Sequence, residues 1–127
     1  MISEHLTQIE AVIDKYTQAS FVQGITYSVE RRSREQAYLY GSLLFVDGSS
    51  LHFREFLDTF DDMMIKQKYA YHYQDGEGQL IFRYDNATHR PTLSFVEHRH
   101  DKEGIIPALS PDLDTVIEEI VAGADWL

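Results

Sequence analysis

The stretch YAYHYQDGEGQLIFRYDNATHRPTLSFVEHRH, residues 69–100, decides how the rest of the chain is arranged. Two segments of alternating side chains flank the loop DGEG, and this pattern predicts a β-hairpin. Closed symmetrically, the hairpin pairs Tyr71 with Phe82, so that one face is aromatic and belongs to the core. The opposite face ends in a polar group formed by Lys68, Arg83 and Asp85.

Imidazoles and cations gather at the end of this stretch. Three of the six histidines lie in its last twelve residues. Residues 83–102 carry a net charge of +1, whereas the remainder of the chain carries −11. A region rich in imidazole, and locally not acidic, therefore stands out in an acidic protein as the candidate site. Its members are Asp85, Asn86, His89, Arg90, His98, Arg99 and His100.

Length and composition predict one folded domain over residues 1–127, with 43% hydrophobic residues. The chain has no cysteine, which excludes disulfides, thiolate zinc sites and cysteine nucleophiles and favours a cytoplasmic setting. No apolar run approaches a membrane span, and no signal peptide opens the chain. The net charge of −10 argues against broad nucleic-acid binding, although a local basic patch could still contact nucleic acid.

The two ends of the chain have the apolar periodicity of helices. Residues 3–17 predict a first helix with Ser3 as N-cap. The final helix is expected to have Ser110 as cap, Pro111 in its first turn and Gly123 at its end, after a connector at 104–110. Between the helices we expect about five or six mostly antiparallel strands. The fold class is therefore α+β, with a twisted sheet flanked by N-terminal and C-terminal helices.

The dipeptide Asp47-Gly48 predicts an earlier hairpin. With a two-residue loop, Leu44 opposes Leu51, and Glu55 shares a face with Leu51 and Phe53. A carboxylate on that face is expected either at a solvated strand end or beside a cation or a hydrogen-bond donor. We include Glu55 among the candidate substrate-binding residues.

A last strand is expected over Thr92–His100. Its period of two sets His98 and His100 on one side and Arg99 on the other. At the other end of the domain, an exposed sheet edge at 21–29 is a candidate surface for a homodimer.

The candidate site fits acid–base chemistry on a phosphodiester without a metal or other cofactor. Histidine titrates near neutrality, so His98, His100 and His89 are candidate acid–base groups, with Asp85 as an orienting carboxylate. Cations would bind and stabilise the phosphate. The candidate substrate-binding residues are Arg83, Lys68, Asn86, Arg90 and Glu55. Such a site suffices for RNA cleavage through the ribose 2′-hydroxyl.

Two alternatives remain open at this point. His98 and His100, with His89 or Asp85, could instead bind a metal ion. The chain could also be a non-catalytic protein-interaction module whose histidine-rich face is only the rim of an interface. No Gly-rich phosphate loop, nucleophile-elbow serine or dinucleotide fingerprint supports other enzyme classes.

Several segments in the same order resemble the TumE-like family of toxin–antitoxin modules. They are DGSSLHFREF, KYAYHYQD, LIFRYDNATHRP, FVEHRH and a closing Ser-Pro-x-Leu helix, which together span about residues 37–121. Family members tend to read Asp-Asn-Ala-Pro-His-His-Pro and then Phe-Pro-His-His-x-His. This chain keeps the residues at Asp85, Asn86, Ala87, His89, Pro91, Phe95, His98 and His100. It departs from the pattern at Thr88, Arg90, Val96 and Glu97.

The resemblance implies a small cytoplasmic prokaryotic toxin encoded beside an antitoxin, expected to be a helix-turn-helix DNA-binding protein. It does not name the molecular target. Ribonuclease activity is our inference from the histidine and arginine chemistry.

Overall fold

The computed structural model describes residues 1–87 and 96–126. Helix α1 (Ile2–Thr17) opens the chain and helix α2 (Leu113–Ala124) closes it. Within the described ranges, seven strands lie between the helices. They are β1 (Val22–Arg31), β2 (Ala37–Phe45), β3 (Ser50–Phe60), β4 (Met63–Gln74), β5 (Leu80–Asp85), β6 (His98–Asp101) and β7 (Gly104–Pro107).

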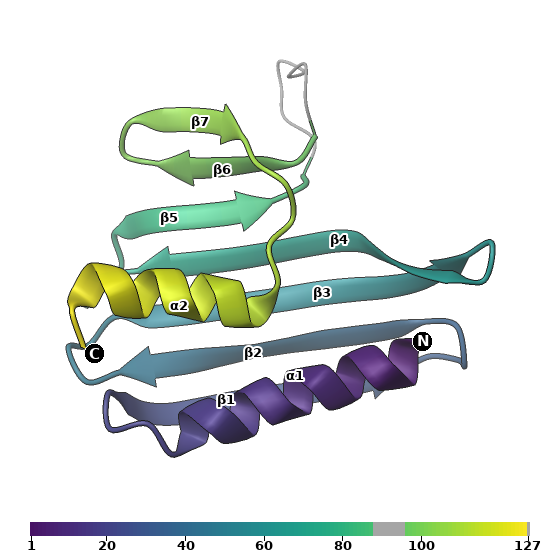
Figure 1. Cartoon of the computed structure of the whole chain (residues 1–127). Helices are drawn as coiled ribbons and strands as arrows, with labels where there is room; N and C mark the ends of the chain where they lie inside the picture. The colour runs from purple at the N-terminus through teal and green to yellow at the C-terminus, as the bar shows by residue number, and fades with distance from the viewer. Residues whose placement is uncertain (88–95, 127) are drawn as a thin grey trace.

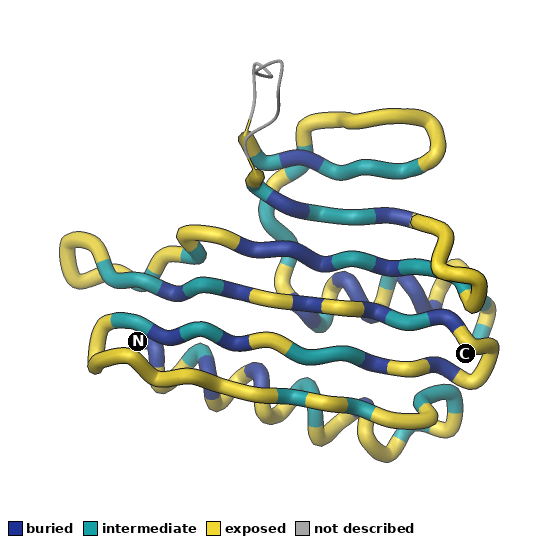
Figure 2. The backbone as a smooth tube through the Cα atoms, turned by 180° about the vertical axis from the view of Figure 1, so that it is seen from behind, coloured by how far each residue is buried: buried dark blue, intermediate teal, exposed yellow. Residues whose placement is uncertain are grey.

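The strands form one antiparallel sheet in which each strand neighbours the next in sequence order. Both helices cover the same side of this sheet, α1 over β1 and β2 and α2 over β3 and β4 (Figure 1). Seen from behind, the other side of the sheet carries no helix of the described residues (Figure 2). We call it the open face. The predicted α+β class is confirmed, with more strands than the expected five or six.

The core lies between the helices and the sheet, because the strands turn every second side chain toward the helices. Strand β3 illustrates the alternation, since Leu51, Phe53 and Leu57 are buried whereas His52 and Arg54 are exposed. The larger core residues include Ile9, Leu39, Leu43, Phe45, Tyr71, Phe82, Leu113, Ile117 and Ile120.

The β2–β3 hairpin is one residue out of the expected register. The strands close around a three-residue loop rather than a two-residue loop, and Gly48 takes φ +87°. Leu43 therefore opposes Leu51, and Leu39 opposes Glu55. Glu55 still shares its face with Leu51, as predicted, because the alternation within β3 does not depend on the loop.

The β4–β5 hairpin is shifted by two residues from its symmetric closure. Tyr71 opposes Tyr84 instead of Phe82, and a bulge lies next to the turn. An even shift leaves every side chain on its predicted face, so the tyrosines of β4 are buried core, as expected. The shift changes the pairs on the open face, where His72 now opposes Arg83.

The helix starts differ from those that the sequence pattern indicated. Helix α1 begins at Ile2 with Met1 as N-cap, not with Ser3 as N-cap. Helix α2 begins at Leu113, and its N-cap is Asp112, whose side chain accepts the Thr115 N–H at 2.8 Å. Ser110 is therefore not the cap, because the Asp112 carboxylate already satisfies a free N–H of the first turn.

The end of helix α2 and the position of strand β7 also differ from the expectation. Helix α2 continues past Gly123, and Asp125 follows it in the left-handed conformation with φ +58°. Strand β7 occupies part of the expected connector at 104–110. All four of its residues are exposed, so it carries no alternation of burial that a sequence pattern could reveal.

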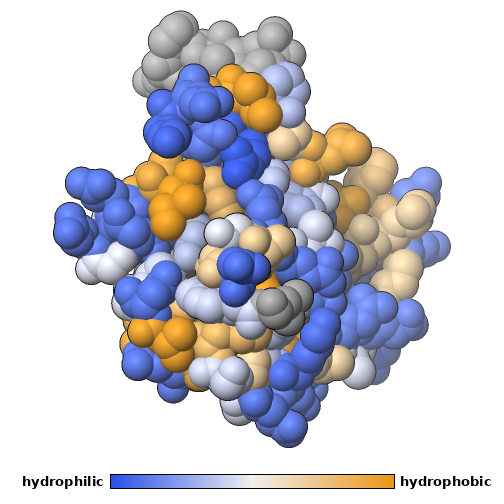
Figure 3. Space-filling model, turned by 60° about the vertical axis from the view of Figure 1, so that its left-hand side comes forward, coloured by the Kyte–Doolittle hydropathy of each residue, from blue (hydrophilic) through white to orange (hydrophobic). Residues whose placement is uncertain are grey.

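The surface at the end of the sheet near the C-terminus is largely hydrophilic, with apolar residues in separate patches (Figure 3). No helix among residues 1–87 and 96–126 has the length and apolar character needed to cross a membrane.

Candidate functional site

Asp85, at the end of β5, is the centre of a cluster of charged side chains on the open face. The β5–β6 register pairs Asp85 with His98 and Arg83 with His100, which sets all four side chains on the same side of the sheet. His98 Nε2 lies 2.7 Å from Asp85 Oδ1, and Arg83 Nε donates to Asp85 Oδ2 at 2.7 Å. We call Arg83, Asp85, His98 and His100 the Asp85 cluster.

The Asp85 carboxyl group is buried and yet charged. Burial by itself acts to raise its pKa, but hydrogen bonds from Arg83 and from the Ala87 N–H, together with the nearby His98, hold the pKa below its ordinary value. The site therefore contains a buried carboxylate, which accepts hydrogen bonds from cationic donors.

His98 is fully buried and held at both ring nitrogens. Its Nδ1 lies 2.5 Å from the Val96 carbonyl oxygen, which only accepts hydrogen bonds, so Nδ1 carries a proton. Its Nε2 faces the Asp85 carboxylate, which also only accepts. Both contacts are hydrogen bonds when the ring carries a proton on each nitrogen, and in that form His98 adds a positive charge to the cluster.

His100 is the more accessible imidazole of the cluster. Its side chain is 19% exposed, and Nε2 lies 3.6 Å from Asp85 Oδ2. The ring meets that of His98 edge to face, with centroids 4.6 Å apart. His100 is therefore oriented by both Asp85 and His98 while it keeps an exposed side.

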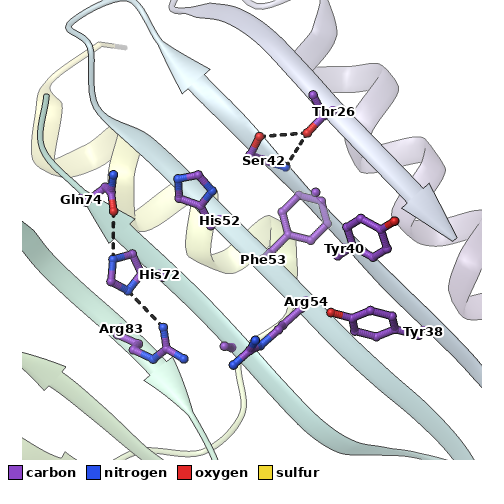
Figure 4. A pocket seen from close by; sticks show the side chains of 12 residues that line it. Thr26, Tyr38, Tyr40, Ser42, His52, Phe53, Arg54, His72, Gln74 and Arg83 are labelled. Atoms are coloured by element: carbon purple, nitrogen blue, oxygen red, sulfur yellow. Dashed lines mark hydrogen bonds between the residues drawn. The ribbon is translucent and has the colours of Figure 1, made fainter. Parts of the chain in front are cut away.

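Arg83 connects the cluster to the centre of the sheet. One terminal nitrogen, Nη1, donates to His72 Nδ1 at 3.1 Å, and His72 Nε2 in turn contacts Gln74 Oε1 at 3.1 Å (Figure 4). Burial and the Arg83 charge both lower the pKa of His72, which matches a neutral ring that accepts from Arg83. Nη2 of Arg83 has no hydrogen-bond partner among the described residues.

Lys68 and Asn86 lie beside the cluster in different roles. Lys68 is exposed and lines the same hollow as Arg83 and Asp85. The Asn86 amide accepts from the Tyr69 N–H at 3.1 Å and donates to the Gln67 carbonyl oxygen at 3.0 Å. Asn86 therefore ties the chain after β5 to the backbone of β4.

Two adjoining hollows follow the open face away from the cluster. One, of about 550 Å³, lies over the middle of β2, β3 and β4. The other, of about 800 Å³, reaches Asp85 and Val96. Tyr38, Arg54 and Arg83 line both, and Arg54 lies between the other two in Figure 4.

The cluster also has the donor atoms of a metal site. One nitrogen each from His98 and His100 and one oxygen from Asp85 all lie within 4.8 Å of one another. The His98 Nδ1 contact with a backbone carbonyl leaves Nε2 as the ligand atom, an arrangement common around bound metals. The Arg83 guanidinium on the same carboxylate opposes a cation there.

A comparison with protein families identifies the chain. The model of a family described as Toxin TumE matches residues 9–124. The chain belongs to the TumE toxin family. No curated protein and no solved structure matched the chain in the same comparisons. Membership in the TumE family implies a cognate antitoxin as partner.

In this TumE toxin, the structure brings together Arg83, Asp85, His98 and His100, with Lys68 close by. His89 and Arg90, which the sequence also indicated, lie outside the described residues. The part of the expected last strand between residues 92 and 95 lies outside them as well, and β6 begins at His98.

The structure does not bring Glu55 to the cluster, because it points to the helix-covered side of the sheet. Glu55 is fully buried; His5 Nε2 lies 2.7 Å from Oε1, and the Tyr71 hydroxyl donates to Oε2 at 2.5 Å. Lys66 donates to the same hydroxyl at 2.7 Å and to the Pro111 carbonyl oxygen at 2.6 Å. Of the two environments expected for this carboxylate, the partnered one is correct.

Several residues around Asp85 and around Glu55 were not predicted from the sequence. His72 was missed because the symmetric closure expected for the hairpin opposes it to Ile81, whereas the two-residue shift opposes it to Arg83. Arg54 and Tyr38 lie on neighbouring strands, and the alternation in β2 and β3 was the signal that could have assigned them to the open face. His5 and Lys66 reach Glu55 only through tertiary packing, which no local pattern reveals.

Proposed function

We propose that this TumE toxin inhibits growth by cleaving RNA at the Asp85 cluster, in the cytoplasm and without a metal ion. The observation that carries the proposal is the convergence of one guanidinium and two imidazoles on a single buried carboxylate. Arg83 and His100 remain partly exposed beside it, with 28% and 19% of their side chains accessible. A phosphate can therefore approach donors whose orientation is already fixed.

The chemistry is transfer of the phosphodiester to the ribose 2′-oxygen. His100 takes the proton of the 2′-hydroxyl, the 2′-oxygen forms a bond to phosphorus, and the bond to the 5′-oxygen breaks. The departing 5′-oxygen takes a proton from water, which an exposed site admits, and the resulting hydroxide takes up the proton that His100 removed, so the neutral imidazole is restored. The products are a 2′,3′-cyclic phosphate and a 5′-hydroxyl end. Nη2 of Arg83 and the ammonium of Lys68 stabilise the negative charge that develops on the phosphate oxygens.

Asp85 and His98 act through the groups that they hold. Asp85 fixes the Arg83 guanidinium through Nε and turns its far edge toward the hollow. His98 is fully buried with both ring nitrogens engaged, so we assign it a positioning role instead of direct proton transfer. Its positive charge also offsets the carboxylate, which would otherwise repel the phosphate.

The test compares wild-type protein with His100→Ala in cells and with purified RNA. We expect His100→Ala to relieve growth inhibition and to reduce cleavage at least a hundredfold, since general acid–base groups contribute roughly 10²–10⁴-fold. Mapping of the RNA ends should find cyclic phosphates and 5′-hydroxyls, and chelators should have no effect.

Lys102→Ala is the matched control, because this exposed residue lies in the turn after β6, outside the cluster. It should keep full activity. If folded His100→Ala remained fully toxic, the proposal would be wrong. Toxicity without any RNA turnover, unaffected by cluster substitutions, would instead favour the non-catalytic interaction module.

A second candidate is a metal site, favoured by the 4.8 Å grouping of the Asp85, His98 and His100 ligand atoms. Elemental analysis of untagged protein and calorimetric titration with Zn²⁺ test it. Stoichiometric binding that is lost in His100→Ala would replace the metal-free mechanism. Absence of binding would leave the guanidinium–carboxylate arrangement as the working site.

We further propose that the cognate antitoxin is a helix-turn-helix DNA-binding protein, as the family resemblance implies. Co-expression with the product of the neighbouring gene should yield a stable complex that binds the promoter DNA. A neighbour that relieves toxicity without binding DNA would contradict this assignment.

A further inference from the structure

We propose that the open face of the sheet is a binding track for single-stranded RNA, which leads the strand across β2, β3 and β4 to the Asp85 cluster. The inference rests on the proposed action on RNA and extends it to the mode of substrate recognition.

The charge of the open face is opposite to that of the whole protein. Arg54, Lys68 and Arg83 line the two hollows, and Asp85 is the one carboxylate among the described lining residues. Asp85 is already matched by Arg83 and His98. The two hollows are therefore cationic in a chain of net charge −10, which fits a polyanion bound at this face.

The remaining carboxylates of this face lie at its margin. Glu30 pairs with Tyr38 at the edge strand, and Asp58 lies beyond Phe56 near the end of β3, where it accepts from Gln36. Neither lines a hollow. Their positions would confine a phosphate backbone to the middle of the sheet.

Aromatic side chains occupy the same track. The rings of Tyr38 and Tyr40 lie 5.2 Å apart, and Tyr40 is 39% exposed on a sheet face that no helix covers. Exposed rings on a flat sheet are platforms on which unpaired bases stack, with guanidinium groups alongside to hold the phosphates. Arg54 lies beside Tyr38 in Figure 4, as such an arrangement requires.

The two hollows adjoin each other, and the second reaches the proposed catalytic cluster. Tyr38, Arg54 and Arg83 line both of them, so the hollow beside Tyr40 borders on the hollow that contains Asp85. Three steps between neighbouring strands separate β2 from β5, a distance of about 14 Å. A short single strand stacked on Tyr38 and Tyr40 would therefore reach Arg83 with a backbone phosphate. A duplex would not bind in this way, because its base faces are hidden.

Binding is measured separately from cleavage, on the full-length His100→Ala protein with a short fluorescent oligoribonucleotide. Fluorescence anisotropy should show that additional Tyr40→Ala or Arg54→Ala substitutions weaken binding roughly tenfold. Arg54→Ala should also reduce the salt dependence, by about 0.7 in the slope of log affinity against log salt, as expected for one lost phosphate contact. The same sequence as a duplex should bind more weakly.

Matched controls lie off the track. Phe60→Ala removes an exposed ring at the tip of the β3–β4 hairpin, and Arg34→Ala removes an exposed cation of the β1–β2 turn. Both should bind RNA as their parent does. The melting temperature of each variant checks that the fold is intact.

The outcomes separate the two proposals. Equal affinity of the Tyr40, Arg54 and control variants would overturn the track, and so would tighter binding to the duplex. Loss of antitoxin binding instead of RNA binding in the same variants would also overturn it and make this face the antitoxin surface. RNA that binds through Tyr40 and Arg54 but is not cleaved by wild-type protein would retain the track and reject the proposed cleavage.

Discussion

The Nε2 atom of His98 lies 2.7 Å from Oδ1 of Asp85, and both side chains are buried on the side of the sheet that has no helix. Removing one partner of a buried ion pair is strongly destabilising, because the other charge then stays buried with neither its partner nor water to solvate it. His98 is thus a structural residue of the sheet as well as a member of the proposed site.

We therefore expect His98→Ala to lower the free energy of unfolding by roughly 3 kcal/mol. Urea denaturation measures this change, with Lys102→Ala as a control of unaltered stability. An unaltered unfolding midpoint in His98→Ala would contradict the structure.

Glu55 gives the protein a stability that depends on pH. Burial raises its pKa, but the hydrogen bond from His5 and the charge of Lys66 outweigh burial, so the pKa is lower than the ordinary value of 4.5. The unfolded state then binds the proton more readily than the folded state. The contribution is complete above the ordinary pKa and is lost as the pH falls through the folded value.

As the pH falls below the ordinary pKa of 4.5, wild-type protein should accordingly lose stability more steeply than Glu55→Gln, which has no proton to bind at this position. Urea unfolding at a series of pH values measures the two slopes. All other carboxyl groups are common to both proteins, so identical slopes would mean that Glu55 titrates normally.

Gly41 is required by a close approach across the sheet. A Cβ atom at this position would lie 2.2 Å from the Thr26 carbonyl oxygen and 2.7 Å from Cζ of the buried Phe53 ring. We expect Gly41→Ala to destabilise the protein by about 1–3 kcal/mol, the usual cost of overpacking. Thermal unfolding provides the measurement.

Gly24→Ala is its matched control, since a Cβ there meets no atom within 4 Å. It should leave the melting temperature unchanged or raise it slightly, because alanine restricts the unfolded chain. A larger loss in Gly24→Ala than in Gly41→Ala would contradict the packing described for β1, β2 and β3.

Arg83→Lys separates charge from geometry at the proposed site. A lysine keeps the positive charge but lacks the planar fork that contacts Asp85 through Nε and His72 through Nη1 at once. We expect growth inhibition and RNA cleavage to fall at least tenfold. Arg34→Lys, the same substitution at a position outside the proposed site, is the control and should keep full activity. Full activity of Arg83→Lys would show that charge alone suffices.

The sequence determined the elements and their faces for a simple reason. Alternation along a strand is a local property, so the buried tyrosines of β4 and the common side of His98 and His100 follow from residue order alone. The terminal helices were equally readable from their apolar periodicity. The family could also be named from short segments, and the match over residues 9–124 agrees with that resemblance.

Only the tertiary structure decided which residues meet across strands and layers. The register of two paired strands depends on how many residues the turn and any bulge contain. The observed registers place His72 opposite Arg83 across β4 and β5, and His100 opposite Arg83 across β5 and β6. Glu55 is contacted by His5 of helix α1, fifty residues away in the sequence, and by Tyr71 of the neighbouring strand β4. Such contacts arise from how the layers pack, a long-range property that no periodicity within a strand encodes.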